Sequence, residues 1–354
     1  MNRLGKMTMS SWSVFAFVFL MLALFGSYPG TGMAQETGSA KIKSVKFMTL
    51  NLLFSEVDDR NKRLRRIADY VAANHVDVLL LQEVVGGELV NTRNSAVDLR
   101  DILRDEHRLK YFSRSAFETG VPNLLSLANA ILSRFDIEFS DDHGLPGVTE
   151  EEFMGFDIKL ARRVLMTRLV IPGFGEIDVF NTHLCARCNL ADREDQLDTV
   201  FDFINKFKNN SGAPRPTVLG GDMNFDLFDN DGDERFLYER VLAEEFSDAY
   251  ADHIIAAAGG KETLETLCED EKNADQHCTV GVSDLNGSNA RRIDYIFARG
   301  FGTPLHSQVV FNPNAPNGVS PTVSDHAAVV VTLKLPFKAP LPNVPLLLLD
   351  DGQN

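Results

Sequence analysis

The chain has 354 residues, of which 50 are acidic and 35 basic, so its formal net charge is −15 at pH 7. A hydrophobic fraction of 44% and a charged fraction of 24% are ordinary for globular proteins, which excludes wholesale disorder, collagen and coiled coil. The acidity argues against broad electrostatic capture of nucleic acid or anionic lipid. It leaves room for a local site where a bound divalent cation reverses the field.

The first 34 residues have the pattern of a secretory signal peptide. Arg3 and Lys6 precede an uncharged, mostly apolar run from Trp12 to Phe25, and small residues follow at 32–34. That run is shorter than the roughly 20 residues that span a bilayer, so a cleaved signal is favoured over a membrane anchor. Removal of the signal takes away two basic residues, so the mature chain has 33 basic and 50 acidic residues and a formal net charge of −17. We therefore expect a secreted or periplasmic protein, with a short linker over 35–42.

Four cysteines, at positions 185, 188, 268 and 278, follow the predicted signal. An even number in an exported chain suggests disulfides, and three pairings are possible. Proximity in the sequence favours Cys268–Cys278 and Cys185–Cys188, although the second pair would close a very tight loop. A zinc site is the alternative, which two unequal spacings and the lack of paired histidines make weaker.

Strands and helices are interleaved along the mature chain. Alternating polarity predicts a strand over 43–52, helical spacing of apolar residues predicts a helix over 59–73, and an apolar run predicts a buried strand over 76–84. Further strands are predicted at 127–134, 164–171, 176–184, 217–222, 292–298 and 327–335, and a helix at 197–207. This distribution predicts one α/β domain over 43–336.

Two segments differ from the rest of the chain. The acidic stretch Asp229 to Glu239 resembles a calcium loop, but with Gly232 at the sixth position Leu227 would be first and Tyr238 last. Neither supplies a carboxylate, so a solvated acidic loop is favoured. The tail over 337–354 is rich in Pro and Leu, and we expect it to pack as an extended strap, to fray or to contact a partner.

Polar side chains follow the predicted strands in five short motifs. Strand ends that meet at one edge of a layered α/β protein commonly form a site, and Gly220-Gly221 would allow a tight turn there. An oxygen-rich set suits Mg²⁺, Mn²⁺ or Ca²⁺ rather than zinc, and a cation with two histidines suits phosphodiester hydrolysis. The motifs are TLNLL (Asn51), LLLQEV (Glu83), NTHL (His183), LGGDMN (Asp222, Asn224) and SDHAAV (Asp325, His326), with Asp294 inside RIDYI.

Each motif alone is more often a turn, a cap or a structural histidine, but the ordered set resembles the endonuclease/exonuclease/phosphatase superfamily, which includes deoxyribonuclease I and neutral sphingomyelinases. The resemblance extends from about Val45 to Leu335. It implies an α/β fold of two mixed β-sheets packed as a sandwich with flanking helices, in four α/β/β/α layers. It also implies a site at one end of that sandwich and a metal-dependent phosphodiester hydrolase.

The same resemblance implies a metal site and a general base. Asn51 and Glu83 would hold the cation, with Asp325 adjacent to it. His326 would activate water, oriented by Asp294. General chemistry agrees, because a base that works near pH 7 is usually histidine and a neighbouring carboxylate fixes its tautomer.

Three further residues receive roles from the resemblance. Asp222 and Asn224 would position the nucleophile and the phosphoryl oxygens. His183 would stabilise charge on the pentavalent phosphate or assist the leaving group. Because no residue need form a covalent intermediate, direct attack of water is expected.

The motif details are most similar to secreted or neutral sphingomyelinases, which predicts a phospholipid headgroup as substrate and transient membrane-surface contact by a monomer. The stretch 311–324 lacks the aromatic-rich hairpin of bacterial sphingomyelinases. The alternative is an extracellular endonuclease that cleaves DNA or RNA, for which Arg162, Arg163 and Arg292 are candidates to contact phosphate. A non-catalytic binding module is a minor alternative. It predicts the loss of site residues, and none is missing.

Overall fold

The computed structural model describes residues 42–54, 59–121, 123–153, 156–207, 215–227, 233–268, 276–282, 290–314 and 322–336. The predicted signal peptide, nearly all of the predicted linker and the C-terminal tail lie outside these ranges. The chain divides into a unit over Met1–Gly38 and a unit over Ser39–Asn354, and every described residue belongs to the second unit.

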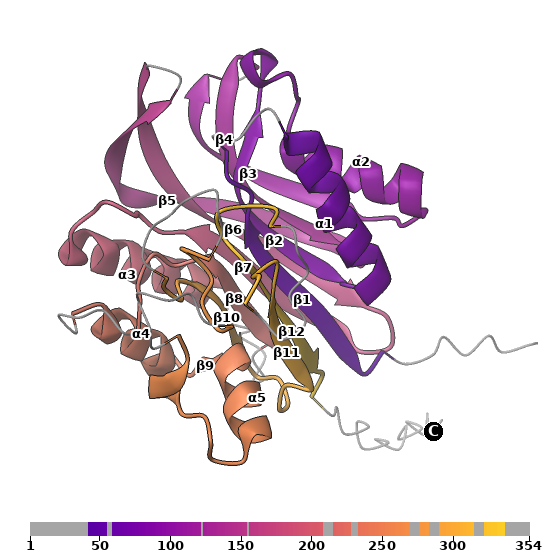
Figure 1. The fold of residues 1–354 in the computed structure, drawn as a ribbon, viewed down its shortest axis with the longest axis vertical. Helices are drawn as coiled ribbons and strands as arrows, with labels where there is room; N and C mark the ends of the chain where they lie inside the picture. Colours follow the sequence, from indigo (N-terminus) through magenta and orange to yellow (C-terminus); the bar gives the residue numbers. More distant parts are fainter. Residues whose placement is uncertain are drawn as a thin grey trace, which may run out of the picture. The chain divides into compact units, whose positions relative to one another are not determined.

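The described residues form two six-stranded sheets (Figure 1). Both sheets are mixed, because β1 pairs with β2 and β7 pairs with β8 in parallel while the other pairs are antiparallel. Sheet one runs in the order β11 (His306–Val310), β12 (Ala328–Lys334), β1 (Ser44–Asn51), β2 (Val78–Gly86), β4 (Leu125–Ser133) and β3 (Phe112–Val121). Sheet two runs in the order β5 (Asp136–Phe153), β6 (Phe156–Ile171), β7 (Gly175–His183), β8 (Thr217–Asp222), β10 (Asp294–Arg299) and β9 (Ser247–Asp248).

Helices cover the outer faces of the sandwich. In Figure 1, α1 (Arg60–Asn74) and α2 (Ser95–His107) lie together on one side, and α3 (Leu190–Lys206) and α4 (Asp233–Ala243) lie on the opposite side. The remaining helices are α5 (Ala249–Ala258) and the short η1 (Glu88–Val90) and η2 (Leu264–Thr266). No helix in the described part of the chain is long and apolar enough to cross a membrane.

The three largest apolar clusters hold these layers together. The first lies between the sheets and includes Phe47, Leu80 and Ile296. The second packs α1 and α2 on sheet one, and the third packs α3 and α4 on sheet two. Alternation along β1 explains the layering, because Phe47 enters the inter-sheet cluster while its neighbour Met48 enters the helix-covered one. The predicted four-layer α/β sandwich is confirmed.

The structure adds elements that the sequence patterns did not predict, among them α2, α4, α5, β3 and β5. The predicted acidic loop over 229–239 is wrong from Asp233 onward, where α4 begins. Leu237, Tyr238 and Val241 form a buried stripe on this helix and pack in the third cluster, which stabilises the helix despite its acidic surroundings. Residues 229–232 of that stretch lie outside the described ranges.

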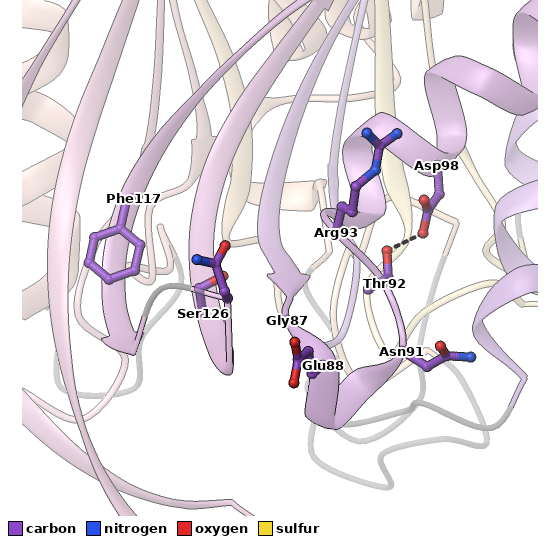
Figure 2. A pocket seen from close by; sticks show the side chains of 9 residues that line it. Gly87, Glu88, Asn91, Thr92, Arg93, Asp98, Phe117 and Ser126 are labelled. Atoms are coloured by element: carbon purple, nitrogen blue, oxygen red, sulfur yellow. Dashed lines mark hydrogen bonds between the residues drawn. The ribbon is translucent and has the colours of Figure 1, made fainter.

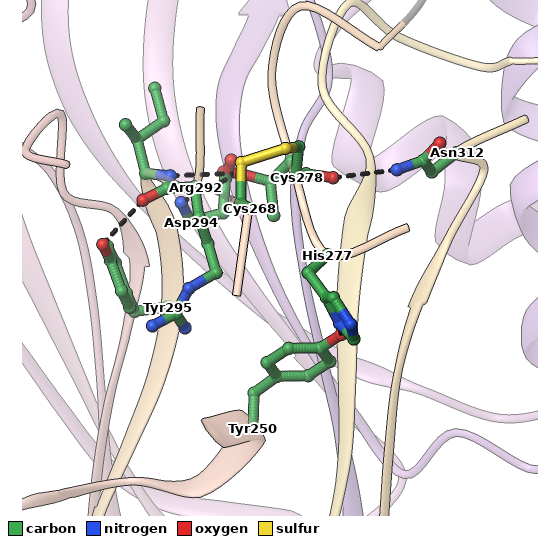
Figure 3. Close-up of a disulfide and its surroundings, with 10 residues drawn as sticks. Tyr250, Cys268, His277, Cys278, Arg292, Asp294, Tyr295 and Asn312 are labelled. Carbon is green, nitrogen blue, oxygen red and sulfur yellow. Dashed lines mark hydrogen bonds between the residues drawn. A yellow bond between two sulfur atoms is a disulfide. The ribbon is translucent and has the colours of Figure 1, made fainter. Parts of the chain in front are cut away.

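Both favoured disulfides are present, and no cysteine in the described part of the chain is free for a zinc site. The Cα atoms are 5.6 Å apart in Cys185–Cys188 and 4.9 Å apart in Cys268–Cys278. Figure 3 shows the second bond beside the segment that precedes β10. The next residue, Thr279, accepts hydrogen bonds at Oγ1 from the backbone N–H groups of Ile293 and Asp294. This disulfide therefore anchors the chain where β10 begins.

Candidate active site

Three predicted site residues form one row across the end of sheet two. In the parallel pair β7–β8, His183 lies opposite Asp222, and in the antiparallel pair β8–β10, Asp294 lies opposite Asp222. Residues directly opposite each other on neighbouring strands project from the same face of a sheet. The strand register therefore brings together residues that are far apart in the sequence.

Sheet one supplies the facing residues. Asn51 ends β1, Glu83 lies near the end of the parallel strand β2, and His326 lies two residues before β12. Asn51 Nδ2 donates a hydrogen bond of 3.2 Å to Asp222 Oδ2. This bond joins the two sheets at the site, where Asn51 and Asp222 are both about 1% exposed.

Unusual backbone geometry marks the same place. Glu83 has a φ of 53° at an irregularity in the β2–β4 pairing, and Asn224 has a φ of 49°. Such left-handed conformations are uncommon for residues other than glycine and occur preferentially at functional sites. Gly221 lies within β8 rather than in the predicted turn. A Cβ at Gly221 would lie 1.9 Å from the Thr182 carbonyl oxygen, so close strand packing requires this glycine.

His326 and Asp294 form a buried pair. His326 Nδ1 lies 2.8 Å from Asp294 Oδ2, and their residues are 7% and 0% exposed. An ionised carboxylate can only accept, so Nδ1 carries a hydrogen and Nε2 of the neutral ring has a free lone pair. Burial by itself lowers the pKa of His326, but the charges of Asp294 and Asp222 outweigh burial and raise that pKa well above its ordinary value.

Asp222 is the common neighbour of these groups. Its Oδ2 lies 3.3 Å from His183 Nε2 and 3.8 Å from His326 Nε2. Burial raises the pKa of Asp222 to about 7, although the charge of His326 opposes this rise. Asn224 packs beside it, because its backbone N–H donates to Asp222 Oδ1 over 3.1 Å and its Nδ2 donates to the Leu184 carbonyl over 2.9 Å.

The carboxylates at this end can hold a cation. Burial and the charge of Asp325 raise the pKa of Glu83, while a hydrogen bond from Asn51 lowers it, so these three predicted metal ligands are neighbours. Ligand atoms of Asp222, Asp294 and His326 also lie within 4.8 Å of one another. Asp294 Oδ1 is buried without a hydrogen-bond partner among the described residues. A divalent cation would relieve this concentration of negative charge.

The three arginines predicted to contact phosphate lie in different environments. Arg162 is 5% exposed, and its Nη1 lies 3.0 Å from His183 Nδ1. Arg163 is partly exposed and binds Asp142 through Nε over 2.6 Å. Adjacent residues on β6 point to opposite faces, so Arg162 and Arg163 cannot act as a pair.

Arg292 has no exposed surface, which argues against its predicted contact with a substrate. Its Nη1 lies 2.7 Å from Asp248 Oδ2, and its guanidinium lies 4.6 Å from the centre of the Tyr295 ring (Figure 3). Asp248 also accepts the backbone N–H groups of Tyr250 and Ala251 at the start of α5. Arg292 therefore stabilises the packing of α5 behind the site.

Two polar residues near the site were not predicted from the sequence. Glu118 on β3 is 6% exposed, and Asn129 on β4 is fully buried. Asn129 Nδ2 donates to Glu118 Oε1 over 2.9 Å, and Glu118 Oε2 lies 3.9 Å from Arg162 Nη1. Burial raises the pKa of Glu118 to about 7, although the charge of Arg162 opposes this. The one sequence signal was the polar Asn129 inside the apolar strand LANAIL.

Two histidines and several buried carboxylates at one end of a two-sheet sandwich are suited to the hydrolysis of phosphoesters. The model of the Endonuclease/Exonuclease/phosphatase family matches residues 48–326, so the chain belongs to this family. The match includes every predicted metal-ligating and catalytic residue from Asn51 to His326 and ends just before β12.

Solved structures agree on the fold. A family protein from Leptotrichia buccalis is 21% identical with a TM-score of 0.58, and the match covers 82% of this chain and 100% of that one. A mannosyl-6-phosphatase from Bacteroides thetaiotaomicron is 20% identical with a TM-score of 0.54, covering 82% and 99%. The human nocturnin catalytic domain with a bound sulfate is 17% identical with a TM-score of 0.55, covering 83% and 94%. A comparison with curated protein sequences gave no match.

We predict that Arg292→Met lowers the free energy of unfolding by about 3–5 kcal/mol, because it leaves the Asp248 carboxylate buried without its charged partner. The double variant Arg292→Met/Asp248→Asn should recover much of this loss, since the pair is then neutral. Urea denaturation of the wild type, both single variants and the double variant measures the coupling. Additive effects, or a raised KM with unchanged stability, would contradict the structural role of Arg292.

Proposed function

We propose that this protein is a divalent-metal-dependent phosphodiester hydrolase that acts by direct attack of water on a phospholipid headgroup ester. The observation that carries the hydrolase assignment is the cluster of His326, Asp294, Asp222 and His183 around one buried point. It combines a base held by a carboxylate with a second histidine that faces the same acidic centre. This arrangement can activate a water molecule and stabilise the charge that develops on phosphorus.

His326 takes the proton from the attacking water through Nε2, while Asp294 holds Nδ1–H and stabilises the imidazolium that forms. Asp222, with Asn224 beside it, orients the water. His183 faces the phosphoryl group from the adjacent strand. None of these residues needs to form a bond to phosphorus.

Asn51, Glu83 and Asp325 would hold the cation, which would be Mg²⁺ or, alternatively, Mn²⁺ or Ca²⁺. Amide and carboxylate oxygens are the ligands these hard cations prefer. The fit is supported by the chemistry of the donor set, because burial and the charge of Asp325 raise the pKa of Glu83 and a divalent cation would stabilise both carboxylates. When bound, the cation supplies positive charge to the phosphoryl oxygens.

The charge of the surface near the site favours a lipid over a nucleic acid. A nuclease needs several free cations along the strand it holds. Arg162 and Arg292 are buried, and Arg163 is paired with Asp142. A groove of about 760 Å³ lies near this end of the sandwich, and its lining includes Arg93, Glu88 and Asp98. Figure 2 shows these three side chains. A groove lined by both acidic and basic side chains is unlike the row of basic side chains that binds the phosphates of a nucleic acid.

An apolar rim supports the lipid substrate. We use this name for Leu89, Val121 and Leu124, whose side chains are 53%, 58% and 44% exposed. The backbone N–H of Leu89 donates to the Leu124 carbonyl over 3.0 Å, so η1 and the β3–β4 hairpin meet. The rim follows β2 directly and therefore lies at the same end of sheet one as Glu83. Apolar side chains exposed together mark surfaces that contact lipid or protein.

We also propose that the protein is exported and acts as a monomer in transient contact with a membrane surface. The signal-like N-terminus and the two disulfides support export, because disulfides persist in oxidising compartments. The strongly acidic chain would be repelled by anionic lipid, so the expected surface is zwitterionic.

The raised pKa of His326 predicts a pH dependence. The base acts only when unprotonated, so kcat/KM for bis(p-nitrophenyl) phosphate with saturating Mg²⁺ should rise with pH, with a midpoint above about 6.5. Asp294→Asn removes a charge that favours the imidazolium, so the midpoint should move to lower pH and kcat should fall by at least about 10²-fold.

Asp105→Asn, a change on the exposed surface of α2, is the matched control and should leave the profile unchanged. An unmoved midpoint in Asp294→Asn would contradict the pairing of Asp294 with the base. Near-wild-type turnover in His326→Ala would contradict the assignment of His326.

The lipid assignment predicts hydrolysis of sphingomyelin or phosphatidylcholine vesicles and no cleavage of single- or double-stranded DNA. Replacing Leu89, Val121 and Leu124 by Ser should slow vesicle hydrolysis by at least about 10-fold, since each apolar side chain that enters lipid contributes on the order of 1 kcal/mol. The rate on the soluble diester should not change.

Leu305→Ser is the matched control, because Leu305 is 52% exposed but lies at the opposite end of sheet one. Product release from vesicles and from plasmid DNA is followed side by side. Cleavage of DNA alone would favour the nuclease, and an equal effect of Leu305→Ser would contradict a lipid-facing rim.

A further inference from the structure

The contact between Arg162 and His183 determines what His183 can do. Arg162 Nη1 lies 3.0 Å from His183 Nδ1 in a region where both residues are almost fully buried. A guanidinium has hydrogen-bond donors only and is never deprotonated in proteins. Nδ1 must therefore accept, so it carries no hydrogen and the neutral ring has its hydrogen on Nε2.

The contact of the second ring nitrogen, Nε2, is consistent with this tautomer. His183 Nε2 lies 3.3 Å from Asp222 Oδ2, where an N–H group can donate to the carboxylate. A second proton on Nδ1 would point at the hydrogens of the Arg162 guanidinium. The geometry thus favours a neutral imidazole that presents one donor to the centre of the site.

Arg162 is itself held in place by residues from other strands. Glu118 Oε2 lies 3.9 Å from Arg162 Nη1. Glu118 Oε1 accepts from Asn129 Nδ2 over 2.9 Å and from the Arg163 backbone N–H over 3.3 Å. A polar chain therefore runs from Asn129 on β4 through Glu118 on β3 and Arg162 on β6 to His183 on β7. Side chains that are fixed in this way hold a catalytic group in one orientation.

We propose that Arg162 is a positioning residue that fixes His183 as the Nε2–H tautomer, so that His183 donates a hydrogen bond to the phosphoryl oxygen and keeps its proton throughout the reaction. This inference rests on the proposed phosphodiester hydrolysis. It decides between the two roles that the sequence left open for His183, because a neutral imidazole N–H is too weak an acid to protonate a leaving group. His326 takes one proton from the attacking water, and the leaving oxygen receives its proton from solvent.

The tautomer can be observed without measuring activity. Full-length protein labelled with ¹⁵N-histidine is studied by long-range ¹H–¹⁵N correlation, and the His183 signals are assigned by their loss in His183→Gln. We expect one protonated nitrogen, Nε2, and one unprotonated nitrogen, Nδ1, at every pH from 5 to 8. A protonated Nδ1 in the wild type would overturn the proposal, whether or not the protein hydrolyses phosphodiesters.

Substitution of Arg162 tests whether this residue is the cause. Arg162→Met should mix the two tautomers of His183 and lower kcat by about 10- to 100-fold with little change in KM, the usual effect of losing an orienting partner. Arg162→Lys retains a cation that can only donate, so it should restore part of the preference for the Nε2–H tautomer and part of kcat. An unaltered Nε2–H signal in Arg162→Met would overturn the positioning role.

A folding defect in Arg162→Met would not obscure the result. Arg162→Met/Glu118→Gln removes both charges of the buried pair, which avoids leaving the Glu118 carboxylate alone. The double variant should show the same mixture of tautomers. His183→Gln, which keeps a neutral donor, should retain more activity than His183→Ala, whereas equal losses would argue against a donor role.

Discussion

The architecture depends on one buried carboxylate, Asp222, at the end where the two sheets meet. Its Oδ2 accepts a hydrogen bond from Asn51 on sheet one and lies near His183 and His326. A buried carboxylate is stable only when polar partners surround it, so each of these contacts constrains the position of a strand end. The requirement to satisfy Asp222 therefore places both histidines and the amide within reach of one point.

Further carboxylates lie close to Asp222 at this end of the sandwich. Glu83, Asp294 and Asp325 lie around the same end, and burial raises the pKa values of Glu83 and Asp222. The overall acidity of the chain, which argues against broad capture of nucleic acid or anionic lipid, thus includes a local cluster of carboxylates that can hold a divalent cation. A cation held there would reverse the local field for an anionic phosphodiester. Arg162 and Arg292 are buried and Arg163 is paired with Asp142, so none of these three arginines is a free surface cation.

Much of the fold and of the site could be predicted from the sequence, for identifiable reasons. Alternation in β1 and the apolar run of β2 are local signals, and Asn51 and Glu83 follow them directly.

The environments of Arg162 and Arg292 could not be predicted. Their partners, Glu118 and Asp248, each lie 44 residues away in the sequence, and local sequence patterns do not determine the strand register that brings these pairs together. The sequence predicted that Gly221 permits a tight turn. In the structure this glycine is required for another reason, because the Thr182 carbonyl oxygen leaves no space for a Cβ on β8. The long β5–β6 hairpin was only partly predicted, since charged residues interrupt its alternation.

We propose that this end of the sandwich hydrolyses a phosphodiester by direct attack of water with the help of a bound cation. The most direct test follows a chiral phosphorothioate diester in H₂¹⁸O, with Mg²⁺ and with EDTA, and determines the configuration at phosphorus in the product. Direct attack by water predicts product only in the presence of Mg²⁺, with one ¹⁸O atom and inverted configuration. Full turnover in EDTA, or retention of configuration through a covalent intermediate, would contradict it.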